Sequence, residues 1–290
     1  MKMPARVALG FLVIILASCA TLGGSRQSGY AEVNGARLYY ETAGSGDPVV
    51  FIHGFTLDSR MWDDQFLVFA ERYRVIRYDA RGFGKSSVAT GPFSIRADLK
   101  ALLDYLGVKH AHVVGLSMGG RYAADFTLES PQMVKSLTLI DSGISGAALP
   151  ELFKELAPAV EAGKRGDVAE AKRIWLRHSL FVPANEQPAV ARRLAQIVGD
   201  YSGWHFVNGL GMHEQPLQPL AITRLTTIRA PTLVIVGSRE IPEATALANK
   251  IAAEIPGAKK VVIPGAGHMS NMEKPAEVNR ALADFLASVR

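Results

Sequence analysis

The feature that most constrains the fold of this chain is a regular alternation of short apolar runs with longer amphipathic stretches. The apolar runs are rich in β-forming residues and end at a turn or polar residue: Leu38–Thr42, Pro48–Ile52, Tyr73–Tyr78, His112–Leu116, Ser136–Asp141, Thr232–Gly237 and Lys259–Pro264. The amphipathic stretches have helical spacing and cover residues 60–71, 94–107, 118–130, 243–255 and 275–289. Strands that alternate with helices predict an α/β fold, in which helices flank a mostly parallel sheet of about eight strands. In such sheets, ligand sites form beyond the carboxyl ends of the strands.

One long interval interrupts this alternation. About ninety residues separate the run that ends near Asp141 from the run that starts near Thr232, and their pattern is helical, for example over Asp167–Arg177 and Pro188–Gly199. A structureless loop of that length is uncommon in a compact domain. We therefore expect a helical cap over residues 142–228, inserted between the sixth and seventh strands of a core formed by residues 30–141 and 229–290.

The first residues have the pattern of an export signal that ends at the only cysteine of the chain. A positive start with Lys2 and Arg6 precedes the uncharged run Val7–Ala17, and eleven residues are too few to span a bilayer. The sequence Leu16-Ala17-Ser18-Cys19 resembles the bacterial lipobox, in which the signal peptide is cut before a cysteine that then carries acyl chains.

This resemblance implies a lipid-anchored protein. Residues 1–18 would form the lipoprotein signal peptide, Cys19 would be acylated and attach the protein to a membrane, and residues 19–29, rich in Gly and Ser, would form a flexible tether. Ala20 follows Cys19, where an Asp would indicate retention at the inner membrane, so we expect export to the outer membrane, on either its periplasmic or its surface side. The alternative is an ordinary secretory signal cut nearby, which would leave a free thiol.

The composition of the remaining chain excludes several classes of function. Residues 1–18 contain two positive charges and no negative ones, so their removal lowers the formal net charge from +5 to +3. Neither a basic nucleic-acid-binding face nor an arginine-rich arm is present, and we expect no nucleic-acid partner. A single cysteine excludes a disulfide framework and thiolate metal sites. We expect neither a metal nor a cofactor.

The central motif is a serine between glycines, at a predicted junction of strand and helix. Gly115-Leu116-Ser117-Met118-Gly119, with Gly120 behind it, follows a buried-strand pattern and opens a helical stretch. Small neighbours are needed because bulky Cβ atoms would collide across so sharp a turn. This pattern is typical of a nucleophile elbow, which exposes the hydroxyl of Ser117 above the sheet and beside a helix N-terminus. The alternative is a glycine-rich turn with an ordinary serine.

A serine hydroxyl needs a base before it becomes a good nucleophile, and His268 is the candidate. Of the seven histidines, only His268 lies directly after a late strand in a tight loop, Pro264-Gly265-Ala266-Gly267-His268-Met269. It also follows Ser117 by a long interval, as the chain order serine, acid, histidine requires.

The histidine needs a carboxylate that holds its tautomer, and two residues are candidates. Glu240 is the first carboxylate after the predicted strand Thr232–Gly237, and Asp141 lies at the tip of the preceding core strand. Either position can bring a carboxylate to the far side of His268. We favour Glu240, with Asp141 as the alternative acid or as a turn cap.

Acyl transfer also needs hydrogen-bond donors for the developing oxyanion. The buried run Val49–Ile52 is followed by His53-Gly54-Phe55. The backbone N–H of Phe55 and that of Met118, next to the predicted nucleophile, form the natural pair of donors. His53 is expected to organise this loop through hydrogen bonds.

Four motifs together resemble the α/β-hydrolase superfamily over residues 30–290. They are His53-Gly54, Asp79-x-Arg81-Gly82-x-Gly84-x-Ser86, Gly115-x-Ser117-Met118-Gly119-Gly120 and Gly265-x-Gly267-His268. The local pattern is similar to the esterase and enol-lactonase branch, with its helical cap. The resemblance implies Ser117 as nucleophile, His268 as base, and Phe55 and Met118 as oxyanion donors. The family most often has Asp where this chain has Glu240, and a serine at the elbow is evidence against haloalkane dehalogenase and epoxide hydrolase chemistry.

These residues predict a cofactor-free serine hydrolase that acts on a small-molecule acyl substrate, namely a carboxylic ester, thioester or lactone. Trp204 and Phe206 in the cap, together with Met269 beside His268, are expected to line the substrate pocket. Packing inside the cap is the alternative for the two aromatic residues. The same catalytic residues would also suit hydrolysis of a carbon–carbon bond or formation of peracids. A non-catalytic binding protein on a hydrolase scaffold is the alternative from another class, and the pattern selects neither a physiological substrate nor an oligomeric state.

Overall fold

The structure is a computed structural model that describes residues 26–289, and its centre is one eight-stranded sheet. The predicted signal peptide, Cys19 and most of the predicted tether lie outside these residues. The strands are β1 (Gln27–Val33), β2 (Ala36–Ala43), β3 (Pro48–Ile52), β4 (Arg74–Tyr78), β5 (Ala111–Leu116), β6 (Val134–Ile140), β7 (Thr232–Gly237) and β8 (Lys259–Ile263). Their order across the sheet is β1-β2-β4-β3-β5-β6-β7-β8. β2 is antiparallel to both of its neighbours and all other neighbouring pairs are parallel, which confirms the predicted mostly parallel sheet.

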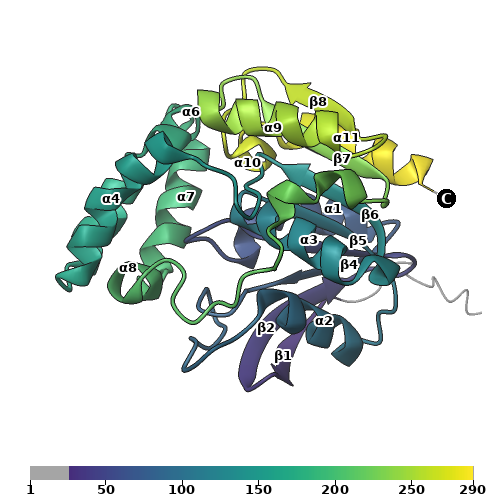
Figure 1. Ribbon diagram of the computed structural model, residues 1–290, viewed down its shortest axis with the longest axis horizontal. Coiled ribbons are helices and arrows are strands. Elements are labelled where there is room, and N and C mark those ends of the chain that lie inside the picture. The colour runs from purple at the N-terminus through teal and green to yellow at the C-terminus, as the bar shows by residue number, and fades with distance from the viewer. Residues whose placement is uncertain (1–25, 290) are drawn as a thin grey trace, which may run out of the picture.

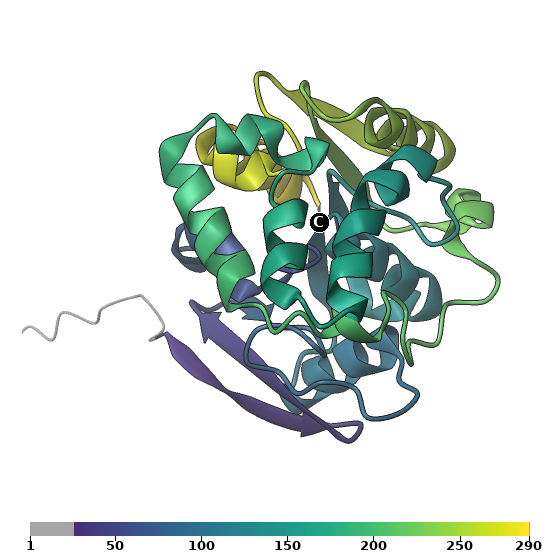
Figure 2. The same cartoon turned by 90° about the vertical axis from the view of Figure 1, so that its left-hand side faces the viewer.

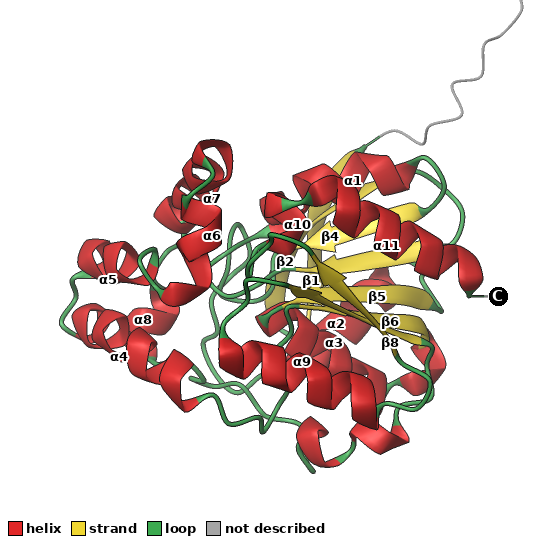
Figure 3. Cartoon of the chain, turned by 90° about the horizontal axis from the view of Figure 1, so that it is seen from above, coloured by secondary structure: helices red, strands yellow, loops and turns green. Residues whose placement is uncertain are grey.

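Helices cover both faces of this sheet. The core helices are α1 (Asp63–Ala70), α2 (Ile95–Tyr105), α3 (Met118–Glu129), α9 (Pro242–Glu254), α10 (Ser270–Glu273) and α11 (Pro275–Ser288), and the 3-10 turn η2 (Pro131–Met133) precedes β6. α1 and α11 lie on one face, whereas α2, α3 and α9 lie on the other (Figure 3). The five predicted core helices match α1, α2, α3, α9 and α11 except at their ends, whereas the short helix α10 was not predicted. The stretch 60–71 divides into the 3-10 turn η1 (Ser59–Trp62) and α1.

Five helices between β6 and β7 form the cap, which lies at one end of the sheet (Figures 1 and 2). They are α4 (Pro150–Lys164), α5 (Val168–Trp175), α6 (Val182–Asn185), α7 (Pro188–Asp200) and α8 (Trp204–Asn208), with the 3-10 turns η3 (Ser179–Phe181), η4 (Ala221–Thr223) and η5 (Leu225–Thr227). Cap residues such as Leu156 and Trp175 share a cavity with residues that directly follow β3 and β5. The cap therefore covers the carboxyl ends of the parallel strands.

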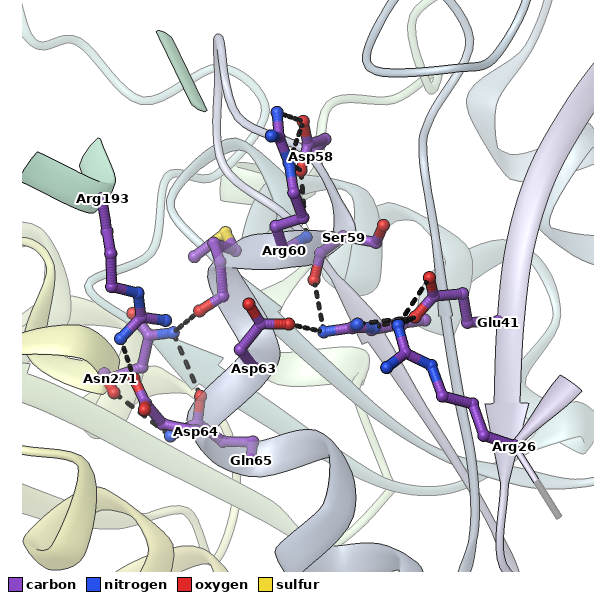
Figure 4. Close-up of polar contacts among 12 residues, drawn as sticks. Arg26, Glu41, Asp58, Ser59, Arg60, Asp63, Asp64, Gln65, Arg193 and Asn271 are labelled. Atoms are coloured by element: carbon purple, nitrogen blue, oxygen red, sulfur yellow. Dashed lines mark hydrogen bonds and ion pairs between the residues drawn. The ribbon is translucent and has the colours of Figure 1, made fainter. Parts of the chain in front are cut away.

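The cap is also joined to the core by ion pairs at the segment η1–α1, and Figure 4 shows the surroundings of this segment. Arg193 of α7 contacts Asp64 of α1, with 2.6 Å between Nη1 and Oδ2. Arg60 of η1 contacts Asp200 at the end of α7 across 2.7 Å. On the other side of the segment, the buried Arg77 of β4 connects Asp63 of α1 with the sheet. The segment that leads out of the loop after β3 is thus held from both the core and the cap.

The strand without a predicted counterpart is β1. Gln27–Gly29, which the sequence pattern assigns to the tether, belong to β1 and pair with β2. β1 is an edge strand with several exposed side chains, so its apolar pattern is weak and backbone pairing holds it in place. The available signal is the turn Asn34-Gly35, where both φ angles are positive (49° and 68°), as in the two-residue turns of β-hairpins.

The central strands form the core. Every residue of β5 and β7 is buried, and Val49–Ile52 of β3 have no exposed surface. Continuous burial of this kind is expected for parallel strands covered on both faces. The loops after these strands are therefore carried by a rigid scaffold. Among the described helices, none is long and apolar enough to cross a membrane.

Candidate active site

Ser117 lies at the turn between β5 and α3, in a backbone conformation that residues other than glycine rarely adopt. Its φ is 56° and its ψ is −116°. A Cβ atom at Gly115 would lie 2.1 Å from the carbonyl oxygen of Gly119, and one at Gly119 would lie 2.1 Å from that of Ile52. The turn therefore requires the glycines of the motif. The strained turn presents the serine side chain to a cavity above the sheet.

Two hydrogen bonds join Ser117, His268 and Glu240 in a line. The Oγ–H of Ser117 donates to Nε2 of His268 across 2.9 Å, and the Nδ1–H of His268 donates to Oε2 of Glu240 across 2.5 Å. The other carboxylate oxygen of Glu240 accepts from the N–H of Ile241 across 2.7 Å, which fixes its orientation. The three residues follow β5, β8 and β7, so the ends of three strands bring together parts of the chain that are far apart in sequence.

Asp141 lies beside this line but forms no hydrogen bond or ion pair with His268 within the described structure. Its Oδ1 accepts from the N–H of Gly237 across 2.8 Å, and its Oδ2 accepts from the hydroxyl of Ser270 across 2.5 Å. Asp141 thus ties the end of β6 to the end of β7 and to the start of α10. Of the two predicted acids, the structure brings Glu240 to His268, and it gives Asp141 the role of a connector between loops.

Burial and charge act in opposite directions on these groups. Burial by itself lowers the pKa of His268, but the charge and hydrogen bond of Glu240, followed by the charges of Asp141 and Glu273, raise that pKa above its usual value. Burial, reinforced by the charge of Glu240, raises the pKa of Asp141 well above its usual value. Of these carboxylates, the one that is hydrogen-bonded to the imidazole of His268 is that of Glu240.

The loop that carries His268 is held on both sides by Glu273, a residue that sequence reasoning missed. Glu273 belongs to α10, and its carboxylate accepts from the N–H of Gly267 across 2.7 Å and from the N–H of Met269 across 3.0 Å. Burial raises the pKa of this carboxyl group. No local motif marks Glu273, and its place just downstream of the histidine is the one available signal.

The two predicted oxyanion donors lie at the same cavity as Ser117 and His268. Met118 is the first residue of α3, and the first N–H groups of a helix have no partner inside it. The backbone N–H of Phe55 follows the end of β3. Neither N–H has an acceptor among the described residues, so both are free to bind an oxygen atom in the cavity.

His53 orients the peptide group that contains the N–H of Phe55. Its Nε2 accepts from the N–H of Ala80 across 3.0 Å, so its Nδ1 carries the proton and donates to the carbonyl oxygen of Gly54 across 2.8 Å. Because a trans peptide is planar, fixing the carbonyl of Gly54 points the N–H of Phe55 in the opposite direction. Burial lowers the pKa of His53 and keeps it neutral. The expected role of His53 as an organiser of the loop agrees with these contacts.

A cavity of about 440 Å³ lies in front of Ser117, between the core and the cap. Its volume is typical of a small-molecule site. The cap contributes an apolar wall from α4, α5 and η3, formed by Leu152, Phe153, Leu156, Trp175, Leu180 and Phe181. The site therefore suits a molecule with an apolar part that approaches the serine oxygen.

The structure corrects part of the predicted pocket. Met269 lines the cavity, but Trp204 and Phe206 do not. Phe206 has no exposed surface and packs edge-to-face on Phe55, with 5.7 Å between ring centroids. Trp204 packs against neighbouring histidines of the same segment. α8 packs against α4, and Phe206 lies between the cap and the loop after β3, whereas Trp175 of α5 lines the cavity.

The lining of the cavity includes an ion pair. Arg121, one turn after Ser117 on α3, makes two hydrogen bonds of 2.8 and 2.9 Å with the carboxylate of Glu214. Among the described residues that line the cavity, Arg121 is the one arginine or lysine and Glu214 is the one acidic residue. The pair leaves this wall with no net charge.

The arrangement as a whole is suited to nucleophilic attack by a serine oxygen. A base contacts the hydroxyl, a carboxylate holds the base, and two residues whose backbone N–H groups have no acceptor in the described structure line the same cavity. Within residues 26–289, no group of three or more His, Cys, Asp or Glu residues is arranged to hold a metal ion.

Comparison with known proteins points to one family. Residues 47–275 match the family described as alpha/beta hydrolase fold. The chain is 31% identical over 280 residues to a 2-hydroxy-6-oxo-6-phenylhexa-2,4-dienoate hydrolase of Burkholderia cepacia, with 87% of this chain and 92% of that protein covered. A thermophilic esterase from Thermogutta terrifontis is similar in structure, with a TM-score of 0.79 and 28% identity over 91% of this chain and 99% of the esterase. A hydrolase from Pseudomonas aeruginosa PA01 gives a TM-score of 0.77 and 30% identity over 90% and 98% of the two chains.

Proposed function

The chain belongs to the α/β-hydrolase superfamily, and from this premise we propose that it is a serine hydrolase that cleaves a small, uncharged carboxylic ester, thioester or lactone. The reaction proceeds through an acyl-enzyme on Ser117. The observation that carries the proposal is the line of hydrogen bonds from Ser117 through His268 to Glu240.

In the first half of the reaction, the oxygen of Ser117 attacks the carbonyl carbon of the substrate while its proton moves to Nε2 of His268. The carbonyl oxygen becomes an oxyanion, which accepts hydrogen bonds from the N–H groups of Phe55 and Met118. Glu240 keeps the second proton on Nδ1 and stabilises the imidazolium. As the tetrahedral intermediate collapses, the bond to the leaving group breaks, His268 gives its proton to the leaving oxygen or sulfur, and the acyl group stays on Ser117.

In the second half, a water molecule takes the place of the leaving group. His268 removes a proton from the water, and the resulting hydroxide attacks the acyl carbon. The second tetrahedral intermediate collapses with cleavage of the bond to the serine oxygen, which receives the proton from His268. The products are a carboxylic acid and the free enzyme.

The lining of the cavity supports an uncharged, partly apolar substrate. The cap wall is made of Leu, Phe and Trp side chains, and the charge of Arg121 is balanced by Glu214. A substrate carboxylate that bound Arg121 would have to displace Glu214 from a two-point hydrogen bond. Esters and lactones with neutral acyl chains avoid that cost.

The alternative enzyme reaction is hydrolysis of a carbon–carbon bond by the same residues. It is favoured by the similarity to the dienoate hydrolase named above. A dienoate substrate carries a carboxylate, however, and in this chain the one arginine that lines the cavity is already paired. We therefore rank ester cleavage first.

The test is hydrolysis of p-nitrophenyl esters from acetate to decanoate by residues 20–290 and by their Ser117→Ala variant. We expect the wild-type protein to hydrolyse the short and medium esters, and the variant to lose a factor on the order of a million in kcat. The dependence of the rate on acyl-chain length then shows how long a chain the cavity accepts. Equal activity of the two proteins, or inactivity of both, would count against the proposal and favour carbon–carbon cleavage or a binding role.

We also propose that the mature protein is anchored to the outer membrane through acylated Cys19. The basic start, the short apolar run and the lipobox-like sequence support this location. Membrane fractionation and mass spectrometry of the N-terminal peptide should find an acylated Cys19 in the outer membrane. The Cys19→Ser variant should be absent from that fraction. An N-terminus without acyl chains in the wild-type protein would contradict the proposal.

A further inference from the structure

The loop that carries the proposed oxyanion donor is joined to the cap by a chain of two hydrogen bonds. Trp175, the last residue of α5, donates its Nε1–H to Oγ1 of Thr56 across 2.7 Å. The hydroxyl of Thr56 donates in turn to the carbonyl oxygen of Phe55 across 2.6 Å. Thr56 has no exposed surface and Trp175 is 4% exposed, so both bonds are shielded from bulk water.

Two consecutive peptide groups of this loop are therefore fixed from opposite sides. The peptide between Gly54 and Phe55 is oriented by His53, which belongs to the core. The peptide between Phe55 and Thr56 is oriented by the threonine hydroxyl, which Trp175 of the cap holds. Since Phe55 connects the two planar groups, the direction of its N–H depends on both of them.

The backbone of Thr56 shows that this loop needs support. Its φ is 61°, in a region that β-branched residues rarely occupy. Such conformations persist only where surrounding contacts determine them. Besides its hydrogen bond, the indole of Trp175 packs edge-to-face on the ring of Phe55, with 5.7 Å between centroids. Trp175 thus contacts the residues on both sides of the second peptide group.

We propose that Trp175 and Thr56 are positioning residues that direct the Phe55 N–H into the oxyanion hole, so that the cap helps to build the catalytic apparatus as well as the cavity wall. The inference rests on the proposed function. It assigns to Trp175 an effect on the rate of the chemical steps, whereas an ordinary wall residue would act on substrate binding alone.

The kinetic test uses Trp175→Phe, which keeps an aromatic ring without the indole N–H, and Thr56→Val, which keeps the shape without the hydroxyl. Each should lower kcat on p-nitrophenyl butyrate about tenfold, with KM changed less than about twofold, because a misdirected donor loses part of its transition-state stabilisation. Inhibition by an alkyl trifluoromethyl ketone, which Ser117 converts into a tetrahedral oxyanion, should weaken by the same factor.

Three further variants make the kinetic test more specific. Thr56→Ser retains the hydroxyl and should keep most of the activity. The double variant Trp175→Phe, Thr56→Val should be no worse than either single one, because both break the same chain of bonds. Trp204→Phe is the matched control, since Trp204 lies in the same cap but does not line the cavity. A loss confined to KM, or one equal to that of Trp204→Phe, would overturn the inference.

The indole N–H resonances give a readout that does not require turnover. The chain has three tryptophans, so the signal that disappears in Trp175→Phe identifies Trp175. In Thr56→Val this signal should move upfield and exchange faster with solvent, whereas in Thr56→Ser it should keep its position. An unchanged signal in Thr56→Val would overturn the hydrogen-bond chain.

The two proposals fail in different ways. If Ser117-dependent activity is present but Trp175→Phe matches the wild-type kcat, only the positioning role is overturned. If no Ser117-dependent activity exists, the proposed function fails and the positioning role fails with it.

Discussion

At the scale of single residues, the site depends on how three carboxylates share the space around one imidazole. Glu240 accepts the hydrogen bond of His268, Asp141 accepts from Ser270 and a backbone N–H, and Glu273 holds the backbone on both sides of the histidine. Only the first of these contacts acts on the imidazole directly. Replacements of the three groups should therefore have different costs.

The clearest comparison is Glu240→Gln against Asp141→Asn. The first should lower kcat by a factor on the order of 10⁴, because an amide at this position favours the wrong tautomer of His268. The second keeps an acceptor for Gly237 and should cost about tenfold or less. Steady-state kinetics on one p-nitrophenyl ester measures both. A larger loss in Asp141→Asn would identify Asp141 as the functional acid.

The pH profile gives a second prediction for the same residues. His268 must be neutral to accept the serine proton, and its pKa lies above the usual value of about 6.5. Activity should therefore be present above this raised pKa and be lost as the pH falls through it. Glu240→Gln removes the largest of the influences that raise the pKa, so the acid limb of kcat/KM should move to lower pH, although the maximum rate is smaller. A limb that stays in place or moves upward would contradict this assignment.

At the scale of elements, the segment η1–α1 separates a buried network from a more exposed one (Figure 4). On the sheet side, Arg77 is 2% exposed and contacts Glu41 of β2, Asp63 and the carbonyl oxygen of Ser59. On the cap side, the ion pair of Arg193 with Asp64 is about one-third exposed, as its side-chain fractions of 33% and 30% show. We expect the exposure of each network to solvent, more than its number of hydrogen bonds, to set its contribution to the free energy of unfolding.

Replacing each arginine by methionine tests this contrast. Arg77→Met should lower the free energy of unfolding by about 3–5 kcal/mol, because it leaves a buried carboxylate with fewer partners. Arg193→Met should cost about 1 kcal/mol or less, since solvent already screens its pair. Urea unfolding followed by fluorescence measures both values. Equal losses would mean that the cap and the core are linked more tightly than the exposure of this pair implies.

At the scale of the whole molecule, substrate selection depends on segments from both the core and the cap. Glu214 lies between the cap helix α8 and β7, and hydrogen bonds from Phe93 to His213 and from Gln215 to Phe93 hold its segment against the core. Its carboxylate contacts Arg121 of the core helix α3 in the lining of the cavity. The charge of the cavity wall is therefore decided by a contact between distant parts of the chain.

The variant Glu214→Gln should change the preference for charged substrates. It leaves the Arg121 cation without its partner, so kcat/KM for an ester with a terminal carboxylate on the acyl chain should rise about tenfold relative to a neutral ester of equal length. Glu214→Asp keeps the negative charge and should not show this gain. An equal change for the charged and the neutral ester in Glu214→Gln would show that the pair does not select charge.

The sequence by itself determined those features that depend on local backbone chemistry and periodicity. Seven of the eight strands match apolar runs, and the turn at Ser117 follows from glycines whose replacement would bring a Cβ atom within 2.1 Å of a carbonyl oxygen. The carboxyl ends of parallel strands meet at one edge, which explains why Ser117 and His268 could be paired from the sequence. The edge strand β1 was not predicted, because it is held by backbone pairing and has little apolar pattern. The turn Asn34-Gly35 is the feature of the sequence that indicates it.

Only the tertiary structure decided which side chains face one another across the site. Glu240 and Asp141 both follow strands that end near His268, and the direction of each carboxylate depends on its hydrogen bonds to Ile241 and Ser270. Helical periodicity likewise predicts that the cap has an apolar face, but the direction of that face depends on how the helices pack. For that reason, Trp175 of α5 reaches the cavity and Thr56, while Phe206 of α8 packs on Phe55 and does not line the cavity.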